Sequence, residues 1–527
     1  MAANEFVLPP VDSSPAQTPP DTTATPLIFV RAFKFTGNTV FTDAELQEFT
    51  VPYINGEVTS SDLAELRHKL TSHYIKNGYI NSGVIIPKQT ITDGVVFFRV
   101  IEGRLVDIHI TGLKHISTGY VKKRLMSGAG PPLNMKNLQK QVRLLHENPL
   151  IRSIKAELKP GNRRGEAVLN AEVDEAVRYR LDAQADNDRS PGVGGNQLTL
   201  HAADLNLSGW GDALGIQYGL TQGLREISGY YDLPLTSRDL ILNLKYKNNS
   251  AHVVEKPFDE LDILSDSEDY SIGISRPFIR KSDRELILSL TAEKRHLETS
   301  LLGRGFSFSP GVRKGEADIT VLRFSQELIQ PQTDSVLAMR SVFSIGIDVL
   351  DATINESGPD GEFFVWTGQI QWARRMKTWW NSQLILRADM QIAANPLLPM
   401  EKFSMGGMGT GGVRGYRKNQ LVKDNAVAGS AELRTPLIQL PLPYLSKGEH
   451  DGTLSIAPFF DIGWGEDIDN SNSETDVIYS LGLGLRWDIS RKIHAYIYYG
   501  HGFEQVENIS RNLQDEGIHF DVRCEFF

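Results

Sequence analysis

The chain has 527 residues, of which 40% are hydrophobic, and it carries a formal net charge of -10. This acidic balance argues against a nucleic-acid-binding protein, so no nucleic acid is expected among its partners. No run of about 20 apolar residues occurs, which excludes a transmembrane helix but not membrane β-strands, whose alternate residues face a polar interior. The single cysteine, Cys524, excludes a disulfide within the chain and a cysteine-based zinc site.

Residues 1–26 contain six prolines among Ser, Thr, Asp and Gln, a composition that predicts an extended arm or linker. The chain opens Met1-Ala2-Ala3-Asn4-Glu5, without a basic segment followed by an apolar core, so no signal peptide is visible.

Residues 27–103 predict the order strand, helix, helix, strand, strand. Thr42-Asp43 predicts the cap of the first helix, and Ser60-Ser61-Asp62 that of the second. The second helix aligns four residues on one face: Leu63, Leu66, Leu70 and Tyr74. Residues 104–175 predict the same order, with strands at 105–111, 151–159 and 167–173 and helices at 115–126 and 133–146. The two copies share a pattern of elements rather than a sequence.

From about residue 176 the helical periodicity stops and a period of two begins. Leu214, Ile216, Tyr218 and Leu220 alternate with small or polar residues, and the same alternation returns at 240–247 and 477–487. A soluble β-sandwich could show this pattern. The length of the uninterrupted series favours a closed membrane barrel, and about 350 residues give about sixteen strands, apolar outside and small or polar inside.

A glycine-rich stretch begins at Phe403 and ends in Val413, Arg414, Gly415 and Tyr416. An arginine on a loop that folds into a barrel needs a carboxylate partner, and Asp461 on a predicted strand offers one. Phe459, Asp461 and Gly463 share a face of that strand, whereas Phe460 and Ile462 lie on the face that suits lipid. We expect Asp461 to point into a water-filled lumen, where the two charges pair without the full desolvation cost of a dry core.

These residues resemble the outer-membrane transporters of two-partner secretion, the TpsB branch of the BamA superfamily, which export haemolysins and filamentous haemagglutinins. The resemblance covers nearly the whole chain from about residue 27. It also includes Asn395-Pro396-Leu397-Leu398-Pro399 and the segment from Gly429 to Pro436. In that family the arginine of a VRGY loop pairs with the aspartate of an F-x-D-x-G strand. One departure is the glycine-rich spacer from Met408 to Gly412, which is longer than usual.

The resemblance implies a transmembrane β-barrel of about sixteen antiparallel strands (residues 176–527) preceded by two small α+β POTRA domains (27–103 and 104–175). It implies a protein translocase of the outer membrane with periplasmic POTRA domains. The expected partners are a secreted exoprotein with an N-terminal secretion domain and outer-membrane lipid, and we expect a monomer. An assembly factor that inserts other barrels is the alternative, although such proteins commonly carry more POTRA domains. A passive porin has no obvious use for two receptor-like domains.

No catalytic site is expected. Gly407-x-Gly409-x-x-Gly412 matches a dinucleotide fingerprint, but no β-α-β unit surrounds it. The twelve histidines show no metal-ligand spacing, and the chain lacks a G-x-S-x-G nucleophile elbow, so we expect no metal, no cofactor and no enzyme activity. An outer-membrane phospholipase would be the enzymatic alternative, and no motif supports it.

Overall fold

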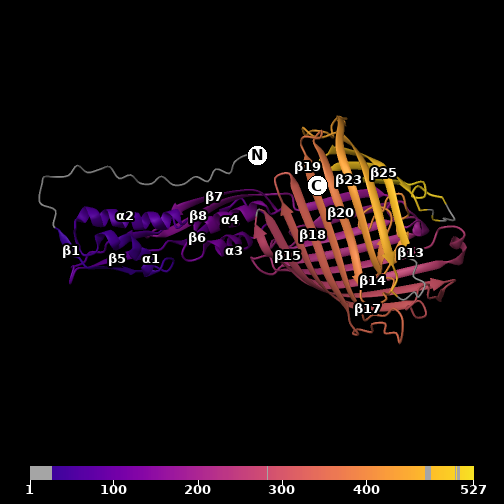
Figure 1. Ribbon diagram of the computed structural model, residues 1–527, viewed down its shortest axis with the longest axis horizontal. Coiled ribbons are helices and arrows are strands. Elements are labelled where there is room, and N and C mark those ends of the chain that lie inside the picture. Colours follow the sequence, from indigo (N-terminus) through magenta and orange to yellow (C-terminus); the bar gives the residue numbers. More distant parts are fainter. Residues whose placement is uncertain (1–26, 282, 469–475, 505, 507–510) are drawn as a thin grey trace. The chain divides into compact units, whose positions relative to one another are not determined.

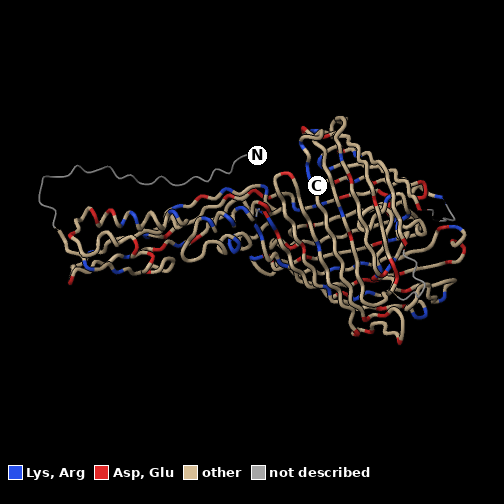
Figure 2. Tube along the Cα trace, viewed as in Figure 1, with Lys and Arg blue, Asp and Glu red and all other residues tan. Residues whose placement is uncertain are grey.

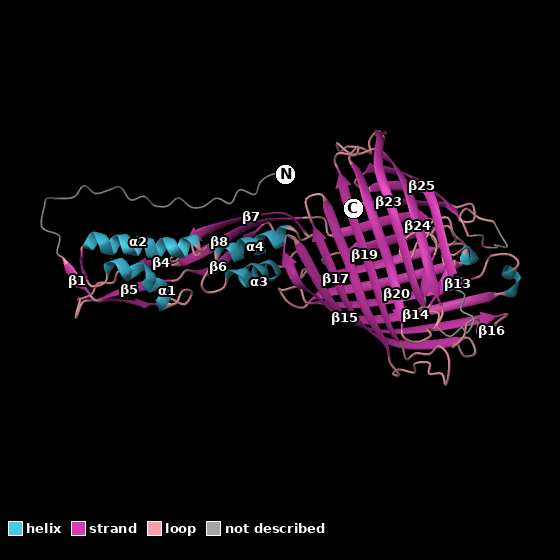
Figure 3. Cartoon of the chain, in the orientation of Figure 1, coloured by secondary structure: helices cyan, strands magenta, loops and turns pink. Residues whose placement is uncertain are grey.

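The computed structural model describes residues 27–527 except 282, 469–475, 505 and 507–510, so the expected arm of residues 1–26 lies outside the described residues. The chain forms two compact units. The first comprises residues 1–177 with 208–211, and the second comprises the remaining residues to 527. Figure 3 shows the α-helices in the first unit and a wall of strands in the second. No helix in the described ranges is long and apolar enough to cross a membrane.

The first unit contains two copies of a three-stranded sheet with two helices (Figure 1). Its first copy consists of β1 (Ile28–Val30), β2 (Ala32–Thr36), α1 (Asp43–Gln47), the 3-10 helix η1 (Glu48–Tyr53), β3 (Gly56–Val58), α2 (Ser60–Lys76), β4 (Gly83–Ile85) and β5 (Val95–Ile101). Its second copy consists of β6 (Arg104–Thr111), α3 (Thr118–Ala129), α4 (Met135–His146), β7 (Ile151–Pro160) and β8 (Glu166–Glu175). The sheet orders, β2-β5-β4 and β6-β8-β7, are equivalent. In each, the first strand is parallel to the last.

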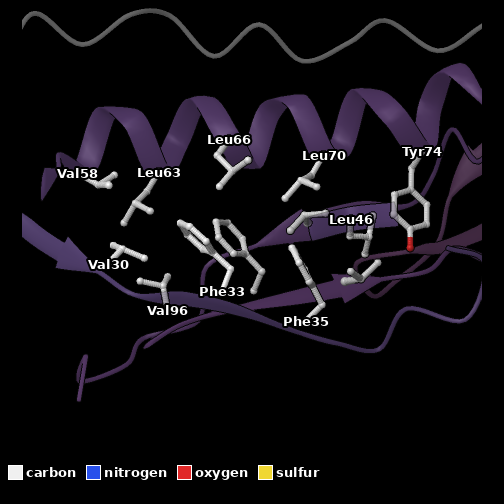
Figure 4. Close-up of a cluster of buried hydrophobic side chains, with 13 residues drawn as sticks. Val30, Phe33, Phe35, Leu46, Val58, Leu63, Leu66, Leu70, Tyr74 and Val96 are labelled. Atoms are coloured by element: carbon white, nitrogen blue, oxygen red, sulfur yellow. The ribbon is translucent and has the colours of Figure 1, made fainter. Parts of the chain in front are cut away.

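Helix α2 covers the first sheet with the face that its sequence predicts. Leu66, Leu70 and Tyr74 are fully buried and pack in one hydrophobic cluster with strand residues such as Phe33 (Figure 4). The cap, however, is Thr59 rather than Ser60-Ser61-Asp62. The Thr59 hydroxyl accepts the Asp62 N–H at 3.1 Å, and the Asp62 carboxylate accepts the Thr59 N–H at 2.9 Å. This reciprocal capping box places the start of the helix at Ser60.

The two copies share a glycine and a glutamate that tie the first strand's end to the last strand. Gly37 and Gly112 have φ of +83° and +89°. A Cβ on Gly37 would lie 2.5 Å from a carbonyl oxygen of β5, and a Cβ on Gly112 would lie 2.2 Å from a carbonyl oxygen of β8. Two residues beyond those carbonyls, Glu102 accepts the Val40 N–H at 2.9 Å and Glu175 accepts the Ile116 N–H at 2.8 Å. The two copies therefore use the same contacts at the end of their first strand.

Glu175 also explains why α3 begins later than the predicted residue 115. Its carboxylate accepts the N–H groups of Lys114, His115 and Ile116, which are therefore not in a helix. Burial opposes ionisation of Glu175, but the hydrogen bonds from these backbone N–H groups prevail and lower its pKa. Ser117 then caps α3 by accepting the Gly119 N–H at 3.2 Å.

The second unit is a closed antiparallel barrel of sixteen strands, which confirms the predicted fold class. They are β9 (Tyr179–Asp186), β10 (Gln197–Asp204), β11 (Ala213–Leu220), β12 (Leu224–Pro234), β13 (Ile241–His252), β14 (Ile263–Lys281), β15 (Arg284–Leu301), β17 (Glu316–Pro331), β18 (Ser335–Gly346), β19 (Phe364–Met376), β20 (Ser382–Ala393), β23 (Asn425–Gln439), β24 (Thr453–Glu466), β25 (Asp476–Ser490), β26 (Ile493–Gly502) and β27 (Ile518–Glu525). Each strand pairs with its neighbours in sequence, and β27 closes the barrel on β9.

Short elements lie between the barrel strands. A two-residue strand, β16 (Arg304–Gly305), pairs antiparallel with the end of β15, and two 3-10 helices, η2 (Pro191–Val193) and η3 (Phe258–Leu261), lie in connections. The predicted period of two is observed: on β11, Leu214 and Ile216 are exposed, whereas Gly215 is buried. Charges of both signs are interspersed along the barrel strands (Figure 2). Because alternate side chains face inward, the barrel has a polar interior, which we call the lumen.

Candidate functional site

Strand β24 supplies the inner wall of the site. Phe459 and Asp461 are 2% and 0% exposed and Gly463 is buried, whereas Phe460 and Ile462 on the other face are 43% and 42% exposed. The alternation is strict because each strand residue points to the opposite side from its neighbours. The three residues of the F-x-D-x-G motif therefore line the lumen together.

The glycine-rich stretch forms a hairpin inside the barrel. Its strands, β21 (Phe403–Met405) and β22 (Leu421–Lys423), pair with each other and not with the barrel wall. We call residues 403–423 the lumenal hairpin. Its tip carries the predicted motif, and its residues contact the inward faces of β20, β23, β24, β25, β26 and β27.

Arg414 and Asp461 form three hydrogen bonds. The Arg414 backbone N–H and Nε donate to Asp461 Oδ2 at 3.0 and 2.8 Å, and NH2 donates to Oδ1 at 2.9 Å. This bidentate geometry matches a planar guanidinium to a planar carboxylate. The backbone bond fixes the direction of the chain at residue 414 as well as the position of its side chain.

A second carboxylate completes the environment of Arg414. Its NH1 donates to Glu432 on β23, and its NH2 donates to Ser430 at 3.1 Å. The guanidinium carbon lies 3.6 Å from the ring centre of Phe459 and 4.7 Å from that of Tyr498 on β26. Arg414 is thus held by two anions and two aromatic faces.

The expectation that the Arg414–Asp461 pair lies in water is wrong, because both side chains are buried. Asp461 is completely buried and Arg414 is 7% exposed. The lumenal hairpin itself covers the pair, together with the aromatic rings of the wall. Two buried charges are tolerated because each finds several hydrogen-bond partners, and removal of the Arg414 side chain would leave the Asp461 carboxylate uncompensated.

Glycines permit the close approach of the hairpin to the wall. A Cβ on Gly463 would lie 3.0 Å from Met405 Sδ and 3.1 Å from Val413 Cγ2. Gly415 has φ of +95°, and a Cβ there would lie 2.9 Å from the backbone of Gly500. The motif glycines are therefore required by contact between the hairpin and strands β24 and β26.

Val413 and Tyr416 bury the apolar part of the hairpin tip. Val413 is fully buried and Tyr416 is 5% exposed, in a cluster with Met405 and Ile478. The Tyr416 hydroxyl donates to the Tyr479 carbonyl at 3.0 Å. The structure thus brings all seven predicted residues of the two motifs into one site.

The residues after the motif extend the ion-pair network across the lumen. Arg417 pairs with Asp515 and, through NH1 at 2.8 Å, with Glu255. Lys418 Nζ lies 3.2 Å from Oδ2 of Asp188. The other carboxylate oxygen of Asp188 accepts the Met408 N–H at 2.7 Å. These bonds tie the glycine-rich spacer to the first and last parts of the barrel sequence.

A separate anchor holds the segment that leads into the hairpin. Glu401 accepts Arg295 NH1 from β15 at 2.8 Å and Arg323 NH2 from β17 at 2.7 Å. Next to it, Leu397 and Leu398 are fully buried in a cluster with residues of β17 and β19. The hairpin is therefore fastened to the β15–β17 wall as well as to the β23–β24 wall.

Sequence reasoning missed Glu432, Tyr498 and Glu401. Ser430 and Glu432 share the inward phase of β23, a signal visible in the period of two, but their pairing with Arg414 requires the register that places Glu432 opposite Phe459. Within the described ranges, no group of three or more His, Cys, Asp and Glu is arranged to hold a metal ion. The arrangement is one that fastens a loop by charge and shape.

The chain was compared with known proteins. A sequence model of the family described as haemolysin secretion/activation protein ShlB/FhaC/HecB matches residues 165–487, and a ShlB-type POTRA domain model matches residues 28–103. Among curated relatives, the outer membrane transporter CdiB of Escherichia coli is 22% identical, over 90% of this chain and 78% of its own length. The heme/hemopexin transporter protein HuxB of Haemophilus influenzae is 27% identical over 36% of this chain and 34% of its own length.

Solved structures share the fold. CdiB from Escherichia coli has a TM-score of 0.68 at 20% identity, covering 98% of this chain and 94% of that one. BamA from Haemophilus ducreyi lacking POTRA domains 1–3 has a TM-score of 0.56 at 13% identity, covering 94% of this chain and all of that one. Together with the match over more than half of its length, these findings show that the chain belongs to the haemolysin secretion/activation family, the outer-membrane transporters of two-partner secretion.

Proposed function

We propose that the lumenal hairpin closes the barrel at rest and that the Arg414–Asp461 pair holds it there while an unfolded exoprotein is absent. The observation that carries this proposal is the fully buried carboxylate of Asp461, which receives three hydrogen bonds from Arg414. A wall contact of this strength is of little use to a barrel whose interior stays open. A barrel of about sixteen strands without a plug is wide enough for an aqueous channel.

The exoprotein crosses the lumen as an extended chain and folds outside. No ATP is present in the periplasm, so the folding of the emerging chain supplies the bias in direction. The hairpin must move or be displaced to clear the path, which requires its bonds to the wall to break. The network is suited to this because it consists of polar bonds that a passing polypeptide can replace.

Cargo recognition is assigned to the two POTRA domains. Strand β7 has ten residues and lies at an edge of its sheet, as does β4 in the first copy. An exposed edge offers unpaired backbone groups to an extended peptide, which adds as a further strand. Phe97, which is 41% exposed on the sheet face away from the helices, adds an apolar contact.

The transporter acts as a monomer in contact with outer-membrane lipid through the exposed apolar residues of its strands. It performs no catalytic step. The domain boundaries are drawn at residues 26, 103 and 175. The ends of β5 at Ile101 and β8 at Glu175 are compatible with the last two.

Deletion of residues 104–175 tests the assignment of cargo recognition. Cells that express the transporter together with its partner exoprotein should lose the exoprotein from the medium when these residues are deleted. The control is the change in gel mobility on heating, which reports that the barrel itself has folded. Full secretion by the deleted form would show that recognition lies elsewhere.

A further inference from the structure

Two adjoining cavities lie inside the barrel between the lumenal hairpin and the end at which β9 begins. One, of about 570 Å³, contacts the hairpin at Met408 and Arg414. The other, of about 1090 Å³, is lined by the turns at that end of the barrel. They share Arg434, Arg486 and Tyr496, so they form one continuous space. We call this space the vestibule.

Guanidinium and phenol groups alternate along the vestibule wall. Arg486 stacks on Tyr496, with its guanidinium carbon 3.8 Å from the ring centre, and its NH1 donates to the Tyr498 hydroxyl at 2.8 Å. Tyr498 in turn donates to Glu432 Oε1 at 3.1 Å, and Arg434 Nε donates to the same oxygen at 2.5 Å. The vestibule wall is therefore connected by hydrogen bonds to the carboxylate that also binds Arg414.

Three guanidinium groups of this row, those of Arg414, Arg434 and Arg486, lie near two carboxylates that form ion pairs with the first two, and a further carboxylate, Asp521, lines the same cavity. Arg414 and Arg434 share the carboxylates of Glu432 and Asp461. Among the described residues, no carboxylate forms an ion pair with Arg486, whose bonds go to tyrosines. Each desolvated guanidinium without an anion attracts one, and attraction is stronger inside a narrow pore than in open water.

The mouth of the vestibule carries charges of both signs. Arg375 and Arg491 line it, as do the carboxylates of Glu449, Asp451 and Asp488. Two of these carboxylates already have partners: Asp488 lies 2.8 Å from His494 Nδ1, and Asp451 accepts backbone N–H groups at 2.7 and 2.8 Å. Among the described residues, neither Arg375 nor Arg491 forms an ion pair with a carboxylate, so both can meet an incoming one.

The row is long enough for a polypeptide rather than a small anion. Arg491 follows the last residue of β25, and Ser480 on the same strand pairs with Asp461, the partner of Arg414. Strand residues rise about 3.4 Å each, so about 10 residues of extended polypeptide fit between the mouth of the vestibule and the Arg414–Asp461 pair. An extended chain with carboxylates at intervals would meet one guanidinium after another.

We propose that the vestibule binds acidic segments of the extended exoprotein on Arg486 and Arg434 and that this binding loosens the hairpin. A carboxylate of the passing chain competes with Glu432 for Arg434, which weakens the set of bonds that hold Arg414. The proposal rests on the proposed function, because it gives the chemistry by which the cargo opens its own path.

The test uses the full chain in planar lipid bilayers, with peptides of about 20 residues added on the side of the POTRA domains. The acidic probe is an unstructured glutamate–glycine–serine peptide, and its counterparts carry Gln or Lys in place of Glu. Wild-type channels should open more often in the presence of the acidic peptide, at a concentration about tenfold lower than with the Gln peptide. The double variant R434Q/R486Q should lose this preference.

Two controls keep the outcome decisive. R340Q removes a guanidinium from the inward phase of β18, where Arg340 pairs with Glu327 at 3.2 Å, and should leave the preference intact. R434K/R486K keeps both positive charges and should retain most of the preference for the acidic peptide. This variant therefore separates loss of charge from misfolding. Equal opening with acidic and Gln peptides in the wild type, or an unchanged preference in R434Q/R486Q, would overturn the proposal.

Secretion distinguishes this inference from the function on which it rests. If wild-type cells secrete the partner exoprotein but show no preference for the acidic peptide, the vestibule proposal fails and the transport function stands. If the acidic peptide opens the channel selectively but the chain supports no secretion of the exoprotein, the transport function fails.

Discussion

Arg414→Ala should harm the docking of the lumenal hairpin more than Asp461→Asn. Asp461 depends on Arg414 for all three of its hydrogen bonds, one of them from the backbone. Arg414 has Glu432 as a second anion. Loss of the arginine side chain therefore leaves the buried Asp461 carboxylate without a compensating charge. Loss of the Asp461 charge leaves the guanidinium still neutralised by Glu432.

The magnitudes follow from burial. Breaking a buried pair by removing one partner costs about 3–5 kcal/mol, which we expect for Arg414→Ala because Asp461 is fully buried. Asp461→Asn keeps one acceptor oxygen and should cost about 1–3 kcal/mol. The double variant should cost less than the sum of the two, because an uncharged amide at position 461 has no need of the guanidinium.

The rate of thiol labelling measures hairpin docking directly. V413C in a C524S background places a thiol at a fully buried position of the hairpin tip, and its labelling requires the hairpin to leave the wall. Each 1.4 kcal/mol of lost docking energy raises the rate about tenfold. Arg414→Ala should raise it about 150- to 4000-fold and Asp461→Asn about 5- to 150-fold, normalised to the unfolded protein.

Strict additivity in the double variant would refute the reasoning. If R414A/D461N labels at a rate equal to the product of the two single effects, the residues do not act as a pair. Equal rates for Asp461→Asn and the wild type would show that the carboxylate contributes only shape.

Three further predictions follow from other parts of the structure. Glu401→Gln should release the segment before the hairpin at a cost of about 3 kcal/mol, because two arginines lose a shared anion, and single-channel recordings should show more frequent wide openings. Gly463→Ala should weaken hairpin docking by about 1–3 kcal/mol, because its Cβ would lie 3.1 Å from Val413, and V413C labelling should quicken. Glu175→Gln should speed hydrogen exchange at amides 114–116 near neutral pH. Because the pKa of Glu175 is lowered by folding, its stabilisation is present above its unfolded pKa of about 4.3 and is lost as the pH falls through its folded pKa, so the two proteins should converge in acid.

The period of two predicted strands with one face toward lipid and one toward the lumen, but a soluble β-sandwich shows the same period, so the length of the series and the family resemblance were needed to predict the barrel. The period was sufficient to predict that Phe459, Asp461 and Gly463 share a face. It could not identify Glu432, because that residue reaches Arg414 through the register between β23 and β24. Register depends on the whole sheet, and it is not encoded in the hydrophobic pattern of one strand.

The POTRA copies show the same limit on a smaller scale. Helix faces followed from the spacing of apolar residues, but the start of α2 was misplaced because Thr59, Ser60, Ser61 and Asp62 are all good capping residues. The choice of Thr59 depends on a reciprocal bond with Asp62 that composition does not reveal. The sequence does not reveal the roles of Glu102 and Glu175 either, because each accepts hydrogen bonds from backbone N–H groups about 60 residues away along the chain.

Crosslinking during secretion tests the central claim, that the exoprotein passes through the lumen of this barrel. A photoreactive side chain is placed at Tyr496 on the inward face of β26 or at Tyr499, which lies on the same strand and is 55% exposed on its outer face. The partner exoprotein is arrested in transit by a fused domain that folds too fast to be exported. Crosslinks to the exoprotein at position 496 and none at 499 are predicted; crosslinks at 499 alone, or none at 496, would contradict passage through the lumen.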